Sequence, residues 1–303
     1  MDEFDYIRWV RRQIPSDPRV LIGPGDDCAA LAPSVRPLLI TTDLLTDGVD
    51  FVLNEVGGRA VGRKAMAVNL SDIAAMAGEP LAAVVGMVLP TDAGRTLAEE
   101  LFHGLRAEAE RFGVPIVGGD TNTWAGQLVV SVTLFGEATV RGAVRRSGAK
   151  PGDWIFVTGP CGGSILGRHL APQPRIREAL ALHETVELHA LIDVSDGLAA
   201  DLNHILDESG CGAALVAEAI PIHADAVELA KRSGKAPLTH ALGDGEDFEL
   251  IFTVSAADGE RLLKAPPVAG LAKIGACVER GLWLDEAGER RPLAPTGWVH
   301  QME

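Results

Sequence analysis

The sequence Val68-Asn69-Leu70-Ser71-Asp72-Ile73-Ala74-Ala75-Met76 lies within a proline-free segment, Gly57 to Gly78, that we expect to be helical. At about 100° per residue its apolar side chains share one face, and Asp72 lies in the middle of that face. A carboxylate on the apolar side of a helix is costly unless a cation or hydrogen-bond donors compensate it. Asp72 is therefore either a buried structural residue or a ligand of a cation.

Four further segments place aspartate beside glycine, serine or threonine at the expected ends of strands. They are Gly25-Asp26-Asp27, Thr41-Thr42-Asp43, Gly118-Gly119-Asp120 and Asp193-Val194-Ser195-Asp196-Gly197. Carboxylate and hydroxyl oxygens suit magnesium, and paired glycines let backbone amides approach an anion closely. Each segment alone is equally compatible with a surface turn or, for Asp196, a helix N-cap. Together the segments predict a metal and phosphate site.

The composition is that of a folded protein with one large domain or, as we expect, two. The chain has 303 residues, 47% of them hydrophobic. With 42 acidic and 27 basic residues its formal net charge is −15, which argues against a nucleic-acid binder because such a protein needs a basic face. Four widely spaced cysteines form no zinc motif and favour a reducing cytoplasm. The N-terminus lacks a signal-peptide core, and no apolar run approaches the ~20 residues of a membrane span.

The first half, residues 1–140, is predicted to be an α+β domain with the order β-α-β-α-β-β. We expect strands over 37–43, 81–89, 114–117 and 127–135, and helices over 57–78 and 91–112. The strand 114–117 is expected to end there and to lead into Gly118-Gly119-Asp120-Thr121. A basic, glycine- and proline-rich connector follows over 141–153, whose arginines either face phosphates or are solvated.

The second half, residues 141–303, is predicted to be an α/β domain. We expect strands over 154–158 and 271–278, a short strand through Leu191-Ile192 into Asp193, and an acidic turn within 242–252 that feeds a further strand. We also expect helices over 175–190 and up to about residue 209, and a hairpin over 281–293. The glycine-rich turn 159–164 is expected to open a helix whose N-terminus could hold a phosphate, although it lacks the Lys-Ser/Thr ending of a Walker loop. Trp298 either stacks on an aromatic ligand or seals a core.

Seven motifs occur in a characteristic order. They are GPGDDCA, TTDLLTDGVDF, AVNLSDIAAMAGEP, VGGDT, RRSGAKPGDWIFVTG, IDVSDGL and GDGEDFELIF. The series resembles the thiamine-monophosphate kinase family, whose superfamily also contains aminoimidazole ribonucleotide synthetase, selenophosphate synthetase and the hydrogenase maturation factor HypE. The resemblance runs from about residue 20 to residue 300. The combined order of the motifs is far more specific than any one of them.

The resemblance implies a PurM-like two-domain fold, with a homodimer whose N-terminal sheets join into a shared barrel. It implies thiamine monophosphate and ATP as substrates and several magnesium ions. The implied magnesium ligands are Asp27, Thr41, Thr42, Asp43, Asp72, Asp120, Asp193 and Asp196. The implied ATP contacts are Gly119, Asp120, Arg146 and Ser195, and the implied substrate contacts are Glu246, Trp298 and position 50.

Three features depart from the family's pattern. Asp50 stands where the family carries a histidine that contacts the substrate, and a carboxylate there would repel a phosphate unless a metal intervenes. The stretch from Gly163 to Arg168 is short, and Asp244 adds an acid to the usual Gly-Gly-Glu-Asp pattern. A superfamily enzyme with another acceptor and a catalytically weak nucleotide-binding regulator therefore remain alternatives. Selenophosphate synthetase is disfavoured because Cys28 follows the acidic pair instead of preceding it.

The implied chemistry needs no general base. The attacking oxygen belongs to a phosphate that is already anionic, and the main obstacle is the repulsion between two anions. Aspartate-bound magnesium would neutralise that charge and fix the line of attack. This explains an abundance of aspartate without a catalytic histidine.

Overall fold

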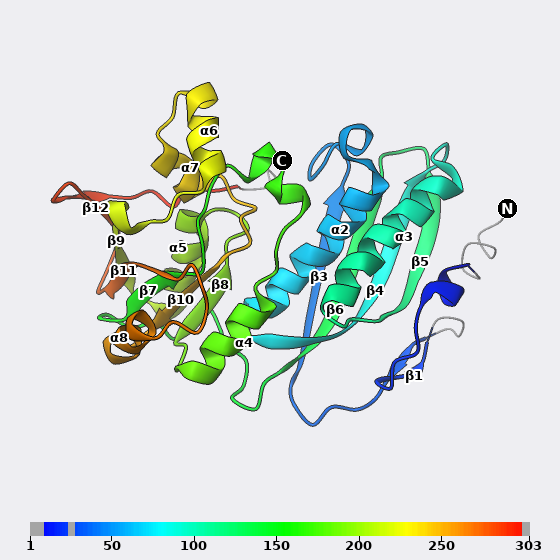
Figure 1. The fold of residues 1–303 in the computed structure, drawn as a ribbon, viewed down its shortest axis with the longest axis horizontal. Coiled ribbons are helices and arrows are strands. Elements are labelled where there is room, and N and C mark those ends of the chain that lie inside the picture. Colours follow the sequence, from blue (N-terminus) through cyan, green and yellow to red (C-terminus); the bar gives the residue numbers. More distant parts are fainter. Residues whose placement is uncertain (1–8, 24–27, 299–303) are drawn as a thin grey trace. The chain divides into compact units, whose positions relative to one another are not determined.

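The computed structural model describes residues 9–23 and 28–298, so Asp27 lies outside the described residues (Figure 1). The chain divides into two compact units. The first comprises Met1–Ile73 and Glu79–Gly142, and the second comprises Ala74–Gly78 and Ala143–Glu303. None of the helices in the described part of the chain is long and apolar enough to cross a membrane.

The first unit is built on a four-stranded sheet of order β3-β6-β4-β5. Its strands are β3 (Leu38–Thr46), β4 (Gly78–Pro90), β5 (Ile116–Trp124) and β6 (Val129–Ala138). β3 pairs with β6 antiparallel, and β4 pairs with β5 parallel. The helices α2 (Leu53–Ala74) and α3 (Gly94–Arg111) cover one face of this sheet (Figure 1). The predicted β-α-β-α-β-β order is confirmed, and a short separate hairpin, β1 (Val20–Ile22) with β2 (Ala30–Leu31), precedes it.

α2 and α3 approach each other closely because glycines lie at their contact. A Cβ on Gly62 would lie 2.2 Å from the carbonyl oxygen of Leu101, and a Cβ on Gly104 would lie 2.1 Å from that of Arg59. α2 begins at Leu53, earlier than predicted, and passes a non-helical Gly57 (φ 75°). It ends at Ala74, so Ala75 and Met76 do not extend its apolar face as predicted.

The strands of the first unit separate a helix-facing side from an opposite side. In β3, Leu39 and Leu45 are buried towards the helices, whereas the alternate residues Leu38, Ile40 and Leu44 are 51%, 62% and 64% exposed. The prediction that this strand ends at Val117 is wrong, because β5 continues through Gly118-Gly119-Asp120-Thr121 to Trp124. They stay extended because they pair with β4 along its length.

The second unit contains a seven-stranded mixed sheet of order β13-β12-β9-β11-β7-β10-β8. Its strands are β7 (Trp154–Val157), β8 (Ala190–Asp193), β9 (Gly212–Val216), β10 (Leu250–Val254), β11 (Ala272–Val278), β12 (Leu282–Glu286) and β13 (Glu289–Pro292). Its α-helices are α4 (Ile176–Thr185), α5 (Leu198–Ser209), α6 (Ala224–Ser233), α7 (Pro237–Gly243) and α8 (Ala256–Lys264). The predicted strands, the end of α5 and the β12–β13 hairpin are confirmed.

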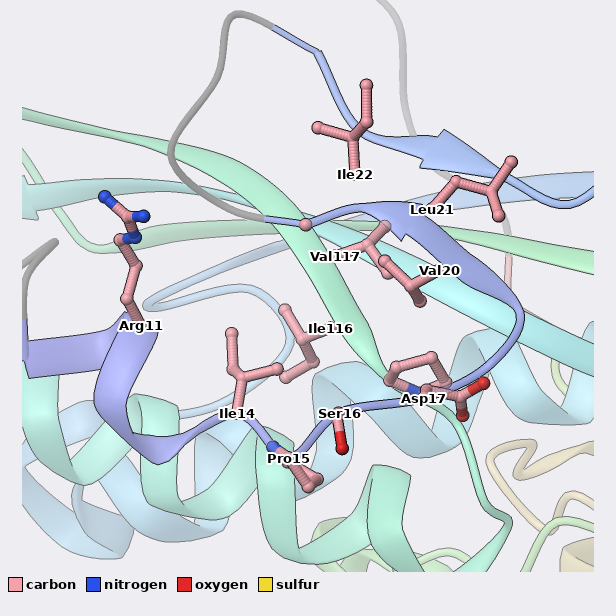
Figure 2. A pocket seen from close by; sticks show the side chains of 12 residues that line it. Arg11, Ile14, Pro15, Ser16, Asp17, Val20, Leu21, Ile22, Ile116 and Val117 are labelled. Carbon is pink, nitrogen blue, oxygen red and sulfur yellow. The ribbon is translucent and has the colours of Figure 1, made fainter.

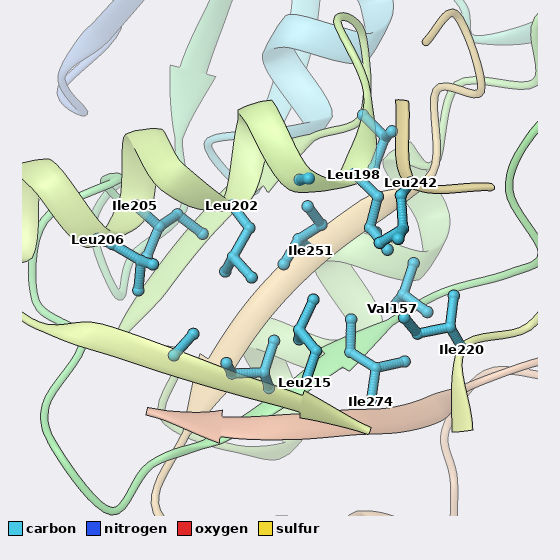
Figure 3. Close-up of a cluster of buried hydrophobic side chains, with 14 of the residues drawn as sticks. Val157, Leu198, Leu202, Ile205, Leu206, Leu215, Ile220, Leu242, Ile251 and Ile274 are labelled. Atoms are coloured by element: carbon cyan, nitrogen blue, oxygen red, sulfur yellow. The ribbon is translucent and has the colours of Figure 1, made fainter. Parts of the chain in front are cut away.

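α5 packs on one face of this sheet and forms the main core of the unit (Figure 3). Leu198, Leu202 and Ile205 of the helix meet Ile251 and Ile274 of the strands, and all five are at most 2% exposed. On the other face Phe156 stacks on Phe252, with ring centroids 5.4 Å apart. α8 lies against that face at Gly259, where a Cβ would come 2.4 Å from the Trp154 ring.

The glycine-rich turn after β7 does not open an α-helix as predicted. Ser164–Leu166 and Arg168–Leu170 form only single 3₁₀ turns, and α4 begins at Ile176. Gly162 and Gly163 have positive φ angles of 94° and 75°, so the chain reverses here instead of entering a helix. The expected phosphate-binding helix N-terminus is therefore absent from this turn.

Candidate active site

Three of the predicted ligands in the first unit meet where β3 runs beside α2. The hydroxyl of Thr41 donates a hydrogen bond to Asp72 Oδ2. The backbone N–H of Asp43 donates to Asn69 Oδ1 at 3.1 Å, and Asn69 is fully buried one turn before Asp72. Asp72 itself is partly exposed. The site thus has partly exposed carboxylate and hydroxyl oxygens, and the buried Asn69 side chain bonds to the strand beneath them.

Thr42 and Asp120 lie on the opposite face of the same sheet. Thr42 pairs with Thr133, and the two hydroxyls hydrogen-bond at 3.1 Å. Asp120 is exposed and lies in register with Gly86 of β4, on the side away from the buried residues Val85 and Met87. Gly119 has a packing role here, because a Cβ would lie 2.1 Å from the carbonyl oxygen of Val85.

Asp50 closes the turn that connects β3 to α2. Its Oδ2 accepts the backbone N–H of Thr46 at 2.7 Å. Its carbonyl oxygen accepts a hydrogen bond of 2.6 Å from Nζ of Lys64, a side chain that is only 1% exposed. Sequence reasoning missed Lys64, although a lysine within the predicted apolar run of α2 was the available signal. A structural role for Asp50 therefore accompanies any contact that it makes with substrate.

A pocket of about 570 Å³ in the first unit adjoins the start of β5 (Figure 2). Ile14 and Val20 of the N-terminal segment and Ile116 and Val117 of β5 converge on it, with Asp17 at one side. The guanidinium of Arg19 donates to Asp17 and holds the pKa of that carboxyl below its ordinary value. Asp17, which lines the pocket together with the polar residues Arg11 and Ser16, is thus already paired.

In the second unit, Asp193 and Asp196 flank the turn between β8 and α5. Asp193 is 3% exposed, and Asp196 is partly exposed. The prediction that Asp196 might be the N-cap of α5 is wrong, since Gly197 occupies that position without a side-chain cap. Asp201 replaces the cap from within the helix, and its Oδ2 accepts the backbone N–H groups of Asp196 and Gly197, both at 3.0 Å.

Acidic groups crowd together at this turn. Burial, with a smaller contribution from the negative charges of Asp193 and Asp196, raises the pKa of Asp201 to about 8 in spite of its backbone hydrogen bonds. Ligand atoms of Asp196, Asp201 and His204 lie within 4.8 Å of one another. Two carboxyl groups and one imidazole nitrogen are ligand types that a divalent cation can use once Asp201 has lost its proton. Asp201 and His204 were missed because their helical spacing from Asp196 resembles an ordinary polar helix face.

Two further segments join this turn and carry the predicted substrate residues. The backbone N–H of Glu246 donates to the carbonyl oxygen of Ser195 at 2.7 Å. The backbone N–H of Trp298 donates to the carbonyl oxygen of Asp196 at 2.9 Å. The Trp298 side chain is 57% exposed, so it does not seal a core in this unit. Three segments that are distant in the sequence are thus joined by backbone hydrogen bonds. They carry five of the predicted site residues, namely Asp193, Ser195, Asp196, Glu246 and Trp298.

Two ion pairs with buried carboxylates hold the segment that follows Glu246. Asp247, whose side chain is 1% exposed, pairs with Arg168 at 2.9 Å. Glu249 pairs with Arg175 through both of its oxygens and accepts the hydroxyl of Thr158 at 2.6 Å. Burial outweighs Arg168 and raises the pKa of Asp247 to about 6. None of these roles was predicted, although acids beside the apolar residues of Gly-Glu-Asp-Phe-Glu-Leu were the signal for them.

The glycine turn after β7 is already bound to this network. The N–H of Gly162 donates to both oxygens of Asp247 at 2.9 and 2.8 Å, and the N–H of Gly163 donates to Asp244 at 2.9 Å. These amides hold carboxylates, so they do not form a phosphate cradle. Arg146 is exposed in the connector, and its carbonyl oxygen accepts the hydroxyl of Ser209 at 3.2 Å.

Both halves of the chain match family descriptions. Residues 25–138 match the N-terminal domain, and residues 139–282 the C-terminal domain, of the AIR synthase related proteins. The thiamine-monophosphate kinase of Rhodopirellula baltica is 41% identical over 97% of this chain and 95% of its own length. That of Salmonella typhimurium is 38% identical over 83% of this chain and 80% of its own length.

A solved structure supports the same relationship. The structure described as AaThiL complexed with AMPPCP and TMP has a TM-score of 0.78 and 31% identity, and the match covers 99% of this chain and 97% of that one. Two-domain sequence matches, high identity over nearly the whole length and a shared fold agree with one another. The chain therefore belongs to the thiamine-monophosphate kinase family of AIR synthase related, PurM-like proteins.

Proposed function

We propose that this chain transfers the γ-phosphoryl group of ATP to the phosphate of thiamine monophosphate and so forms thiamine diphosphate. The observation that carries the proposal is the joining of three segments at one turn. Ser195 and Asp196 accept backbone hydrogen bonds from Glu246 and Trp298, which places family substrate positions beside family metal positions. Similarity to thiamine-monophosphate kinases over nearly the whole chain supports the choice of acceptor.

The acidic residues of the turn are assigned to metal binding, and Trp298 is assigned to the aromatic part of the acceptor. Asp193 and Asp196 would hold magnesium, and the exposed indole of Trp298 offers an apolar surface for the aromatic rings of thiamine. Bound magnesium supplies positive charge that reduces the repulsion between two anionic substrates. Glu246 would orient the acceptor. We assign no general base, because the attacking phosphate oxygen is already ionised.

In the first unit we assign metal and nucleotide binding to the residues of β3, α2 and β5. Asp43, Asp72 and Thr41 would provide oxygen ligands of the kind magnesium prefers on the helix side of β3, and Thr42 would provide one on the opposite face, the face of Asp120. Gly119 and Asp120, and in the second unit Arg146 and Ser195, are assigned to ATP, and Asp27 completes the proposed set of ligands. The hydrogen bond from Thr41 to Asp72 orients a carboxylate that we assign to the metal.

We also propose a cytoplasmic homodimer. Leu38, Ile40 and Leu44 of β3 are each more than half exposed on the face of the sheet away from α2 and α3. A row of exposed apolar side chains on a sheet is typical of a surface that pairs with another copy. The four cysteines are free, which fits a reducing compartment.

The test is an assay of the full chain with thiamine monophosphate, ATP and magnesium. ADP release is followed continuously, and products are separated by chromatography. Thiamine diphosphate formed from the monophosphate, and not from free thiamine, is the expected result. Magnesium-dependent ATP binding without this product would refute the assigned acceptor and favour a different phosphorylated substrate.

A further inference from the structure

The turn that carries Glu246 has a left-handed backbone. The φ angles are 75° at Gly245, 53° at Glu246 and 53° at Phe248. Residues with side chains rarely adopt this conformation, and it persists only where the surroundings hold it. The segments around the turn must therefore hold Glu246 in this backbone conformation.

One side of the turn is fixed to the segment between β8 and α5. The N–H of Glu246 donates to Ser195 O at 2.7 Å, and the N–H of Phe248 donates to Val194 O at 2.8 Å. No side chain fits at Gly245, where a Cβ would lie 2.7 Å from the carbonyl oxygen of Ser195. Any rotation of the turn would break these bonds.

The other side of the turn is fixed by Asp247. Its buried carboxylate accepts the N–H of Gly162 through both oxygens, at 2.9 and 2.8 Å. Arg168 Nη2 donates to Asp247 Oδ1 and to the carbonyl oxygen of Gly162, each at 2.9 Å. Ser164 Oγ adds a bond of 2.8 Å to the carbonyl oxygen of Gly245. Because Asp247 stands between Glu246 and Phe248, anchoring it fixes both left-handed residues.

We propose that Asp247, held by Arg168, is a positioning residue that sets the orientation of Glu246 towards the acceptor. The inference rests on the proposed function, in which Glu246 contacts thiamine monophosphate. Asp247 is too deeply buried to touch the substrate itself, and its side chain points into the glycine turn. Loss of the Arg168–Asp247 pair releases the turn and weakens acceptor binding more than ATP binding, because Glu246 lies in the turn itself, whereas the ATP contact Ser195 is joined to it through its backbone carbonyl.

The experiment compares Asp247→Asn with the wild-type chain in steady-state kinetics. Displacement of the Glu246 side chain would weaken acceptor binding. We therefore expect KM for thiamine monophosphate to rise about tenfold with a smaller change in kcat. The Kd of a non-hydrolysable ATP analogue is expected to rise much less than this KM. The matched control is Asp285→Asn, which breaks the exposed pair with Arg290 in the same unit and should leave KM unchanged.

A double-mutant cycle separates positioning from general stability. If Asp247 acts through Glu246, Asp247→Asn adds no further rise in KM to a Glu246→Gln variant. Additive effects, or an unchanged KM in a folded Asp247→Asn protein, would overturn the inference. Arg168→Lys, which keeps the charge but loses the planar fork, tests the same pair if Asp247→Asn does not fold, and it should raise KM as well. A wild-type chain that makes no thiamine diphosphate would refute the proposed function instead.

Discussion

The hydroxyl of Thr41 on β3 donates a hydrogen bond to the carboxylate of Asp72 on α2. This bond joins a strand to the helix that covers it, at a point where both side chains reach the surface. It orients Asp72 without neutralising it, because a hydroxyl carries no charge. The bond thus fixes the position of the Asp72 carboxylate, whose charge is the feature that we assign to metal binding.

Replacement of this charge tests the proposed metal site. Asp72→Asn keeps the acceptor for Thr41 but removes the charge, and we expect kcat to fall at least about 100-fold because electrostatic stabilisation is lost. Thermal unfolding should show a folded protein. Asp92→Asn, at an exposed position of the same unit, is the control. Normal turnover in a folded Asp72→Asn protein would contradict the assigned ligand role.

Asp50 has two separable effects to test, the stability of the turn after β3 and the affinity for the acceptor. Asp50→Ala removes the acceptor for the Thr46 N–H, and we expect the free energy of unfolding to fall by about 1 kcal/mol. Asp50→Asn retains an acceptor and removes a charge that repels phosphate, so stability should hold while KM for thiamine monophosphate falls. Chemical denaturation and steady-state kinetics measure the two effects. A higher KM in Asp50→Asn would contradict the predicted repulsion and would mean that the carboxylate favours binding of thiamine monophosphate.

Trp298 offers a test that does not disturb a core. Because its side chain is 57% exposed, Trp298→Ala should leave the melting temperature unchanged. KM for thiamine monophosphate should rise about tenfold through the loss of one aromatic contact, while KM for ATP stays constant. Trp298→Phe preserves a ring and should recover most of the affinity. Equal loss of affinity in both variants would argue against stacking.

The contact between α2 and α3 depends on the absence of a side chain at Gly62. Gly62→Ala forces a Cβ against the backbone of Leu101, and we expect it to lower the free energy of unfolding by about 2 kcal/mol. Gly58→Ala in the same helix is the matched control, since its new Cβ meets mainly the side chains of Leu97 and Glu100, which can move. Urea denaturation compares the two, and equal stability would show that the helices can separate freely.

Asp247 makes a pH-dependent contribution to stability. Burial raises its pKa to about 6, so the folded chain binds this proton more tightly than the unfolded chain does. Stability from this group is therefore full below its ordinary pKa near 4 and is lost as the pH rises to about 6. Relative to Asp247→Asn, the wild-type chain should lose about 2 kcal/mol of unfolding free energy between pH 4 and pH 7. A difference that does not vary with pH would contradict the raised pKa.

Local periodicity in the sequence was sufficient to predict most elements of the fold. Alternation along β3 and β6 and the apolar repeat of α3 are short-range patterns, and hydrophobic burial translates them directly into strands and a helix. The prediction failed where local signals were overruled. Gly118 and Gly119 look like a turn, but pairing with β4 keeps them extended, and the glycines after β7 reverse the chain because they bind distant carboxylates.

The sequence by itself determined which chemistry the chain carries, because the order of its acidic motifs and their neighbours is characteristic of one family. Only the tertiary structure decided which of those acids meet. Thr42 and Thr41 are adjacent in the sequence yet lie on opposite faces of the sheet, whereas Glu246 and Trp298 come from distant segments and bond to Ser195 and Asp196. The reason is physical: side-chain direction follows from local backbone geometry, but hydrogen bonds between distant segments form only once the core has folded.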